Sequence, residues 1–245
     1  MNTNTSTAAH TPGRVRVWDI PTRLFHWSLV FCIASAWVSF RYSEVIGDNT
    51  MRWHRWNGYA ILVLLVFRVI WGFAGSSTSR WTSFVRWPWA AAGYALDLLR
   101  GRSRHFLGHN PAGTYMVLGL LAVVAVQGGL GLFTVEHNDT GADGPLYLLV
   151  SEATYVKLSK WHTWVFYNVL LPLIALHIVA NTLYAFVKKD PLIRAMVTGD
   201  KPAGTYEDEN EAHIVRNVTL RALSCLFAAL VFVFGGIALV GGRLL

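Results

Sequence analysis

Long apolar stretches alternate with short polar ones along the whole chain. Five of these stretches are long enough to cross a bilayer, which takes about 20 apolar residues in a helix. They run over residues 22–40, 53–73, 112–133, 160–189 and 220–240. The pattern predicts an all-α integral membrane protein, a helical bundle with a four-helix core and a fifth C-terminal transmembrane helix.

Composition supports a membrane protein and argues against a soluble domain and against a nucleic-acid-binding protein. The chain is 53% hydrophobic and 14% charged, whereas soluble domains carry about 25% charged residues. Its net charge of +7 does not indicate nucleic-acid binding, because the basic residues lie in short segments between apolar spans. Cys32 and Cys225 each lie inside an apolar span. We expect both to act as small hydrophobic residues, not as a disulfide or a thiolate metal site.

Charge in the connecting segments predicts the topology. Arginines concentrate before the first span, between the second and third, and after the fourth. The positive-inside rule therefore puts the N-terminus in the cytoplasm and the acidic loop before the fourth span in the periplasm. The segment WPWAAAGYALDLLR, in the basic connection 75–111, predicts a short interfacial helix. The predicted organisation is a disordered tail (1–13), a four-span domain (14–201), an acidic solvated linker (202–219) and the fifth span (220–245).

Nine histidines divide into two groups. Five fall in tails or loops, where we expect solvated side chains: His10, His105, His109, His137 and His213. The other four lie on predicted spans, where titratable groups are costly and indicate function: His26, His54, His162 and His177.

The topology sorts these four histidines by depth. His26 lies near the cytoplasmic start of the first span, and His54 near the periplasmic start of the second. The fourth span runs inward, so His162 is periplasmic and His177 lies toward the cytoplasm. Their spacing of fifteen residues corresponds to ~22 Å of rise and keeps them within ~60° around one helix. We therefore expect two pairs, His54 with His162 and His26 with His177.

Two imidazoles on facing helices suit haem iron, which takes two axial ligands in cofactor sites built inside helix bundles. Zinc takes four ligands, commonly with a thiolate or carboxylate that no span places here. The glycine-rich third span would leave room for a porphyrin. Four large aromatic side chains either pack against the rings or form an interfacial belt: Phe25, Trp27, Trp53 and Trp164.

Two further residues on the spans have consequences. Arg68 follows His54 by fourteen positions, about 21 Å further along the helix and within ~40° of the same face. It either lies beside the inner haem, paired with a propionate, or extends to the cytoplasmic interface. Pro172 leaves the carbonyl of Asn168 without its helical partner, which predicts a kink between the two histidines.

Six motifs, spread over residues 14–201, agree with one family: RVWDIPTRLFHW, MRWHRWNGY, FRVIWGFAG, FLGHNPAG, LIALHIVA and IRAMVTGDK. They resemble the bacterial di-haem cytochrome b561 family, which includes b-type cytochrome subunits of membrane-bound nickel–iron hydrogenases and is similar in plan to formate dehydrogenase cytochrome subunits. The fifth span and its linker depart from the usual four-span form, and the extra helix is a candidate docking element for a partner.

The resemblance implies a cofactor set and a function. The histidines on the spans would be axial ligands of two b haems, in a multi-pass protein of the bacterial inner membrane. The chain would exchange electrons with membrane quinone as the electron-transfer subunit of an oxidoreductase, opposite a periplasmic c-type cytochrome or hydrogenase-like subunit.

Two other functions remain open at this point. A stand-alone superoxide or ferric reductase-type quinone oxidoreductase of the same fold would react without another subunit. A haem-free transporter, whose histidines bind ions transiently, would purify colourless.

Overall fold

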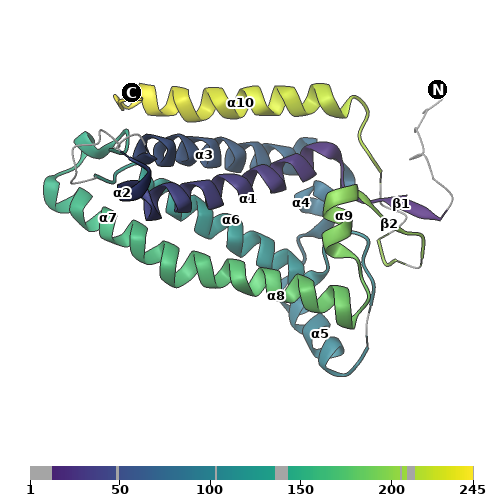
Figure 1. Ribbon diagram of the computed structural model, residues 1–245. Coiled ribbons are helices and arrows are strands. Elements are labelled where there is room, and N and C mark those ends of the chain that lie inside the picture. Colours follow the sequence, from purple (N-terminus) through teal and green to yellow (C-terminus); the bar gives the residue numbers. More distant parts are fainter. Residues whose placement is uncertain are drawn as a thin grey trace. The chain divides into compact units, whose positions relative to one another are not determined.

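The computed structural model describes residues 13–47, 50–102, 104–135, 143–204, 206–208 and 213–244 (Figure 1). The predicted tail up to residue 12 and the side chains of His10 and His137 lie outside these ranges.

Within the described residues, five helical segments are long and apolar enough to cross a membrane. They are α1 (Ile20–Arg41), α3 (Thr50–Ala74), α6 (Pro111–Gly131), the continuous segment Glu152–Val187, and α10 (Val218–Leu239). The prediction of an all-α, multi-pass membrane protein is confirmed. The fourth span begins at Glu152 and not at residue 160. Its first two turns are helical but polar, so the pattern of apolar residues did not include them.

The fourth span contains a wide turn. It consists of α7 (Glu152–Val165), a π-helical turn η3 (Phe166–Leu170) and α8 (Leu171–Val187). Pro172, which has no N–H to donate, lies two residues after the end of this turn, so the helical pattern changes close to the place where we predicted a kink. The carbonyl of Asn168, which Pro172 cannot bond, belongs to this turn.

In the described part of the chain, β1 (Arg14–Arg16) precedes the first span. Seven other short elements lie between the spans: α2 (Ser43–Ile46), η1 (Ser77–Ser79), α4 (Trp81–Phe84), α5 (Pro88–Leu99), η2 (Tyr147–Leu149), α9 (Leu192–Thr198) and β2 (Asp200–Pro202). Helix α5 is the expected short helix, with Pro88 in its first turn. Before and after this proline, Trp87 and Trp89 are exposed and stack with ring centroids 5.1 Å apart. Exposed tryptophans fit a position at the membrane interface.

The chain divides into two compact units, and each is described by itself. The first comprises 1–24, 70–119 and 176–225, and the second comprises 25–69, 120–175 and 226–245.

The first unit contains a two-stranded antiparallel sheet, β1 with β2, in which Val15 pairs with Lys201 (Figure 1). Its apolar core consists of Val15, Val17, Trp18, Leu107 and Ala195. The N-terminal strand therefore packs against residues that follow the fourth span. The predicted domain boundary after Lys201 falls inside β2, a strand that the first unit needs for its pairing.

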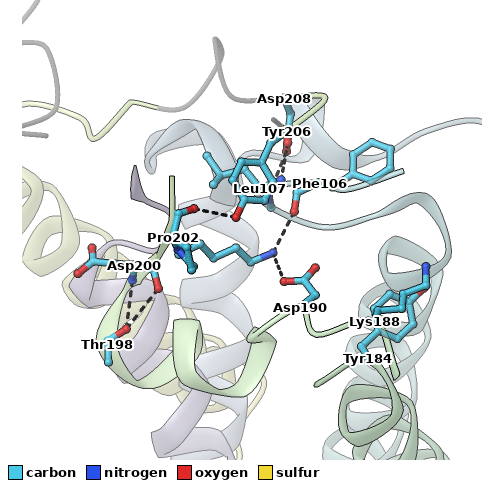
Figure 2. A network of polar contacts seen from close by, with 12 residues as sticks. Phe106, Leu107, Tyr184, Lys188, Asp190, Thr198, Asp200, Pro202, Tyr206 and Asp208 are labelled. Carbon is cyan, nitrogen blue, oxygen red and sulfur yellow. Dashed lines mark hydrogen bonds and ion pairs between the residues drawn. The ribbon is translucent and has the colours of Figure 1, made fainter. Parts of the chain in front are cut away.

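Two described residues of the segment after β2, Asp208 and His213, are anchored where we expected a solvated linker. That the rest of residues 202–219 is solvated stays a prediction. The carboxylate of Asp208 accepts hydrogen bonds from the backbone N–H groups of Leu107 and Gly108, at 2.5 and 3.0 Å (Figure 2). The N–H of His213 donates to the Ser77 hydroxyl at 2.8 Å. Backbone groups that are removed from water need such partners, so the acidic and polar residues here anchor the segment.

His109 also differs from its predicted solvated state. Its ring centroid lies 4.8 Å from that of Trp18 and 4.6 Å from that of Phe84. The aromatic rings come from segments distant in sequence, so nothing local to His109 predicts the contact.

The second unit has its own apolar core, formed by Cys32, Ile61, Leu65, Val124 and Leu170. These residues come from α1, α3, α6 and η3. Cys32 is a buried free thiol and packs as a small hydrophobic residue, as predicted. This core lies next to the cavity described below, because Ile61, Val124 and Leu170 also line that cavity.

Candidate functional site

The second unit contains a cavity of about 120 Å³ between α1, α3, α6, α7 and η3. His54 on α3 and His162 on α7 both line it. The structure thus brings together the pair of histidines that the topology predicted for the periplasmic side.

The two imidazole rings are spaced as ligands of one metal ion would be. Their centroids are 6.1 Å apart, with an interplanar angle of 79°. Two metal–imidazole bonds of ~2.0–2.1 Å, plus half a ring on each side, span roughly 6 Å. The separation therefore fits one iron ion held between His54 and His162.

Hydrogen bonds to backbone carbonyls orient both rings. The Nδ1 atom of His54 lies 2.8 Å from the carbonyl oxygen of Ala36, and that of His162 lies 3.0 Å from the carbonyl oxygen of Gln127. A carbonyl oxygen can only accept, so each Nδ1 carries the hydrogen and donates it. In neutral imidazole, Nε2 then keeps its lone pair, which is the form that binds a metal.

Gln127 has a second contact with the same ring. Its side-chain nitrogen lies 3.2 Å from Nε2 of His162, and its amide oxygen is buried without a hydrogen-bond partner among the described residues. We did not select Gln127 from the sequence, although a glutamine near the end of an apolar span is an uncommon feature that could have indicated it.

Glycines of α6 allow side chains of neighbouring helices to approach closely beside the cavity. The room for a porphyrin that we expected from this glycine-rich span stays a prediction. A Cβ at Gly131 would lie 3.2 Å from Cε1 of His162, and one at Gly128 would lie 2.8 Å from a methyl carbon of Leu62. Gly128 and Gly131 both line the cavity. Gly129, between them, has no such neighbour within 4 Å.

Arg55 and Tyr59 also line the cavity, and we did not select either of them from the sequence. Arg55 is the one charged residue among the described residues that line it. Tyr59 is 3% exposed, and its hydroxyl has no hydrogen-bond partner in the described part of the chain. These residues follow His54 by one and five positions, and polar residues in an apolar span were the signal available for them.

The other two predicted ligands are placed separately. His26 lies in the second unit, half-buried, with its ring edge-on to Trp27 at 5.0 Å. His177 lies in the first unit, where the Asn181 side-chain nitrogen donates to its carbonyl oxygen at 2.7 Å. Because the two residues belong to different units, their pairing stays a prediction.

Arg68 is buried, with 3% of its surface exposed. An arginine that extended to the headgroups would leave its guanidinium accessible, so burial favours the interior position among our two alternatives. The aromatic residues divide: Phe25 is buried, 6.4 Å from Phe67, whereas Trp27, Trp53 and Trp164 are exposed, as in an interfacial belt.

Apolar membrane spans and two neighbouring imidazoles in a cavity between helices are what a haem site in a helix bundle requires. The family model described as "Prokaryotic cytochrome b561" matches residues 17–199, and the chain belongs to this family. It is therefore a multi-pass membrane cytochrome that uses haem b in electron transfer.

Two relatives, from Escherichia coli K12 and Escherichia coli O157:H7, carry the description "Probable Ni/Fe-hydrogenase 1 B-type cytochrome subunit". Each is 25% identical over 174 residues, which cover 60% of this chain and 73% of the relative.

Proposed function

We propose that this chain is the cytochrome b subunit of a respiratory complex in a bacterial inner membrane. It transfers electrons between a periplasmic redox partner and the membrane quinone pool, with its N-terminus in the cytoplasm. The observation that carries the proposal is the spacing of His54 and His162, whose ring centroids lie 6.1 Å apart.

Two b haems would each be held by two histidines, one between His54 and His162 and one between His26 and His177. When bound, haem b supplies a one-electron carrier. The chain's own residues hold the rings: the carbonyl groups of Ala36 and Gln127 accept from Nδ1 and fix the tautomer of the outer pair. Two imidazole ligands would leave no axial position for oxygen or a substrate, which favours electron transfer.

The relatives support a choice of partner. Their description names a nickel–iron hydrogenase, so a hydrogenase-like subunit is the first candidate, ahead of a c-type cytochrome. The distribution of arginines supports the orientation, because it places the His54–His162 cavity toward the periplasm.

A haem count tests the cofactor proposal. A pyridine haemochrome assay on the purified chain should give two haems per polypeptide. His54→Ala and His162→Ala should each remove the same spectral component, and His105→Ala, a substitution of an exposed histidine, should remove none. Loss of different components in the His54 and His162 variants would refute the outer pair.

Purification in mild detergent tests the complex. A hydrogenase-like subunit should co-purify, and the recovered complex should reduce a quinone analogue when given hydrogen. If the chain alone reacts with superoxide or ferric iron and with quinone, the stand-alone reductase is correct. A colourless chain would instead support the transporter.

A further inference from the structure

Tyr59 lines the cavity that contains His54 and His162. It is 3% exposed, and its hydroxyl has no hydrogen-bond partner among the described residues. A buried hydroxyl without a partner costs free energy. An acceptor that enters the cavity would remove this cost.

The cavity is lined by one positively charged side chain and, among the described residues, by no carboxylate. Arg55 lines it one helical turn before Tyr59, and the described residues that line it include no aspartate or glutamate. Residues four apart lie on the same face of a helix. A cation and a hydrogen-bond donor on one face match a carboxylate, and the propionates of haem b are carboxylates.

The last span holds the Tyr59 ring. The ring centroid of Phe234, on α10, lies 5.8 Å from that of Tyr59 at an interplanar angle of 70°. On the same helix Ala229, Val233 and Ile237 are buried, at a spacing of four residues that forms one face. This part of α10 is therefore packed within the second unit.

Residues that follow α10 also contact residues at the cavity. The N–H of Arg243 donates to the carbonyl oxygen of Pro145 at 2.9 Å, and Pro145 lines the cavity. A Cβ at Gly242 would lie 2.6 Å from side-chain atoms of Leu146 and Ile237. The packing of α10 is thus close on both sides of Phe234.

We propose that Tyr59, positioned by Phe234, donates its hydroxyl hydrogen to a propionate of the haem held between His54 and His162. The fifth span would then set the reduction potential of this haem, in addition to any role in docking a partner. This inference rests on the proposed function, because it requires a haem in the outer cavity.

Potentiometric titration of the purified protein tests the role of Tyr59. Loss of the hydrogen bond leaves more negative charge near the iron, which favours the oxidised state. Tyr59→Phe should keep both haems and lower the equilibrium constant for reducing the outer haem by about threefold, roughly 30 mV for a one-electron couple. Tyr167→Phe is the matched control, because Tyr167 also lines the cavity but is exposed; it should titrate as wild type.

Phe234→Ala should shift the same haem in the same direction, and Phe232→Ala, a change of an exposed phenylalanine on the same span, should not. If Phe234 acts through Tyr59, the double variant should match Tyr59→Phe alone and not the sum of the two shifts. The redox-difference infrared spectrum should change in the carboxylate region in Tyr59→Phe.

The failures are distinguishable. A wild-type protein without the outer haem would refute the proposed function itself. A normal haem count with equal potentials in Tyr59→Phe and Tyr167→Phe would overturn only the role of Tyr59. An additive double variant would overturn the link through Phe234, and an unchanged carboxylate region would overturn the propionate as the acceptor.

Discussion

The ammonium nitrogen of Lys201 lies 2.9 Å from a carboxylate oxygen of Asp190, the residue labelled in Figure 2. The lysine side chain is wholly buried. The same nitrogen donates to the carbonyl oxygen of Phe106 at 2.9 Å. Three segments of the first unit therefore meet at one charge: the turn after α8, strand β2 and the chain before α6. Burial of a charge is tolerated because both partners are present.

Removal of the lysine charge should loosen this part of the first unit. Lys201→Met leaves Asp190, which is 10% exposed on its side chain, without its cation, and breaking a buried pair costs about 3–5 kcal/mol. Hydrogen exchange of the backbone amides near Phe106 and in β2 should report a lower free energy of local opening by about that amount.

A nearby surface ion pair supplies the control. Arg16 and Asp200 lie 2.8 Å apart on the same two strands, with side chains 44% and 25% exposed. Arg16→Ala should lower the same free energy by at most about 1 kcal/mol. Equal effects of the two substitutions would show that burial of Lys201 does not matter.

Stability of the first unit should rise with pH in the mildly alkaline range. Burial lowers the pKa of Lys201 below 10.5, although the negative charge of Asp190 raises it in part. Burial also lowers the pKa of Lys188. Between the lowered values and 10.5 the unfolded state binds more protons than the folded state, so stability increases with pH.

Above pH 10.5, where the lysine contribution is complete, the trend should reverse. Burial, together with a hydrogen bond to Tyr184, raises the pKa of Tyr94 above 10.0. The folded state then keeps a proton that the unfolded state loses, so stability falls with rising pH. Thermal unfolding in detergent across this range should show a maximum, and Lys201→Met should flatten its rising side. A decrease in stability throughout the alkaline range would contradict this assignment.

A single methyl group on α6 should disturb the outer haem. Gly131→Ala places a Cβ 3.2 Å from Cε1 of His162, tighter than most contacts, so the ring must move by a few tenths of an ångström. We expect partial loss of the outer haem and a shifted low-spin electron paramagnetic resonance signal. Gly129→Ala, with open space around its Cβ, should retain the wild-type signal, and similar losses in both variants would mean only that α6 tolerates no alanine.

Arg68 should act on the other haem. A unit charge ~8 Å from iron, at an effective dielectric constant near ~20, is worth on the order of 2 kcal/mol before compensation by a propionate. Arg68→Gln should lower the midpoint potential of the inner haem, the one proposed between His26 and His177, by on the order of tens of millivolts. The reason is that a nearby cation favours the reduced state. Arg52→Gln, an exposed change on the same helix, is the control. Equal shifts of both haems would place Arg68 elsewhere than its spacing from His54 predicts.

The sequence predicted the features that depend on long apolar runs and failed where contacts are distant. All five spans were found, because lipid requires about 20 apolar residues wherever a helix crosses. That His54 and His162 lie near each other followed from depth alone, which the predicted topology determines; their joint ligation of a haem stays a prediction. The carboxylate of Asp208, by contrast, reads as a solvated acid beside other acids, and only the folded chain brings the N–H groups of Leu107 and Gly108 to it.

Tyr59 shows the same limit inside the candidate site. Its position five residues after His54 is visible in the sequence, but its burial depends on Phe234 in the last span. A spacing rule within one helix cannot report which ring from another helix covers a residue. The fifth span therefore looked like an addition to the bundle, whereas part of it packs against a residue of the cavity.

The acceptors for the Nδ1 hydrogens of His54 and His162 are main-chain oxygens, which has an evolutionary consequence. Main-chain atoms are the same whatever amino acid is encoded, so no point mutation at position 36 or 127, other than one that moves the helix, removes the acceptor. As far as this acceptor is concerned, residues 36 and 127 can change while the arrangement of the helices keeps the tautomers of His54 and His162. A change of Gln127 would still remove its side-chain contact with Nε2 of His162. We therefore expect the orientation of both imidazoles to survive substitutions at these two positions that leave the helices in place.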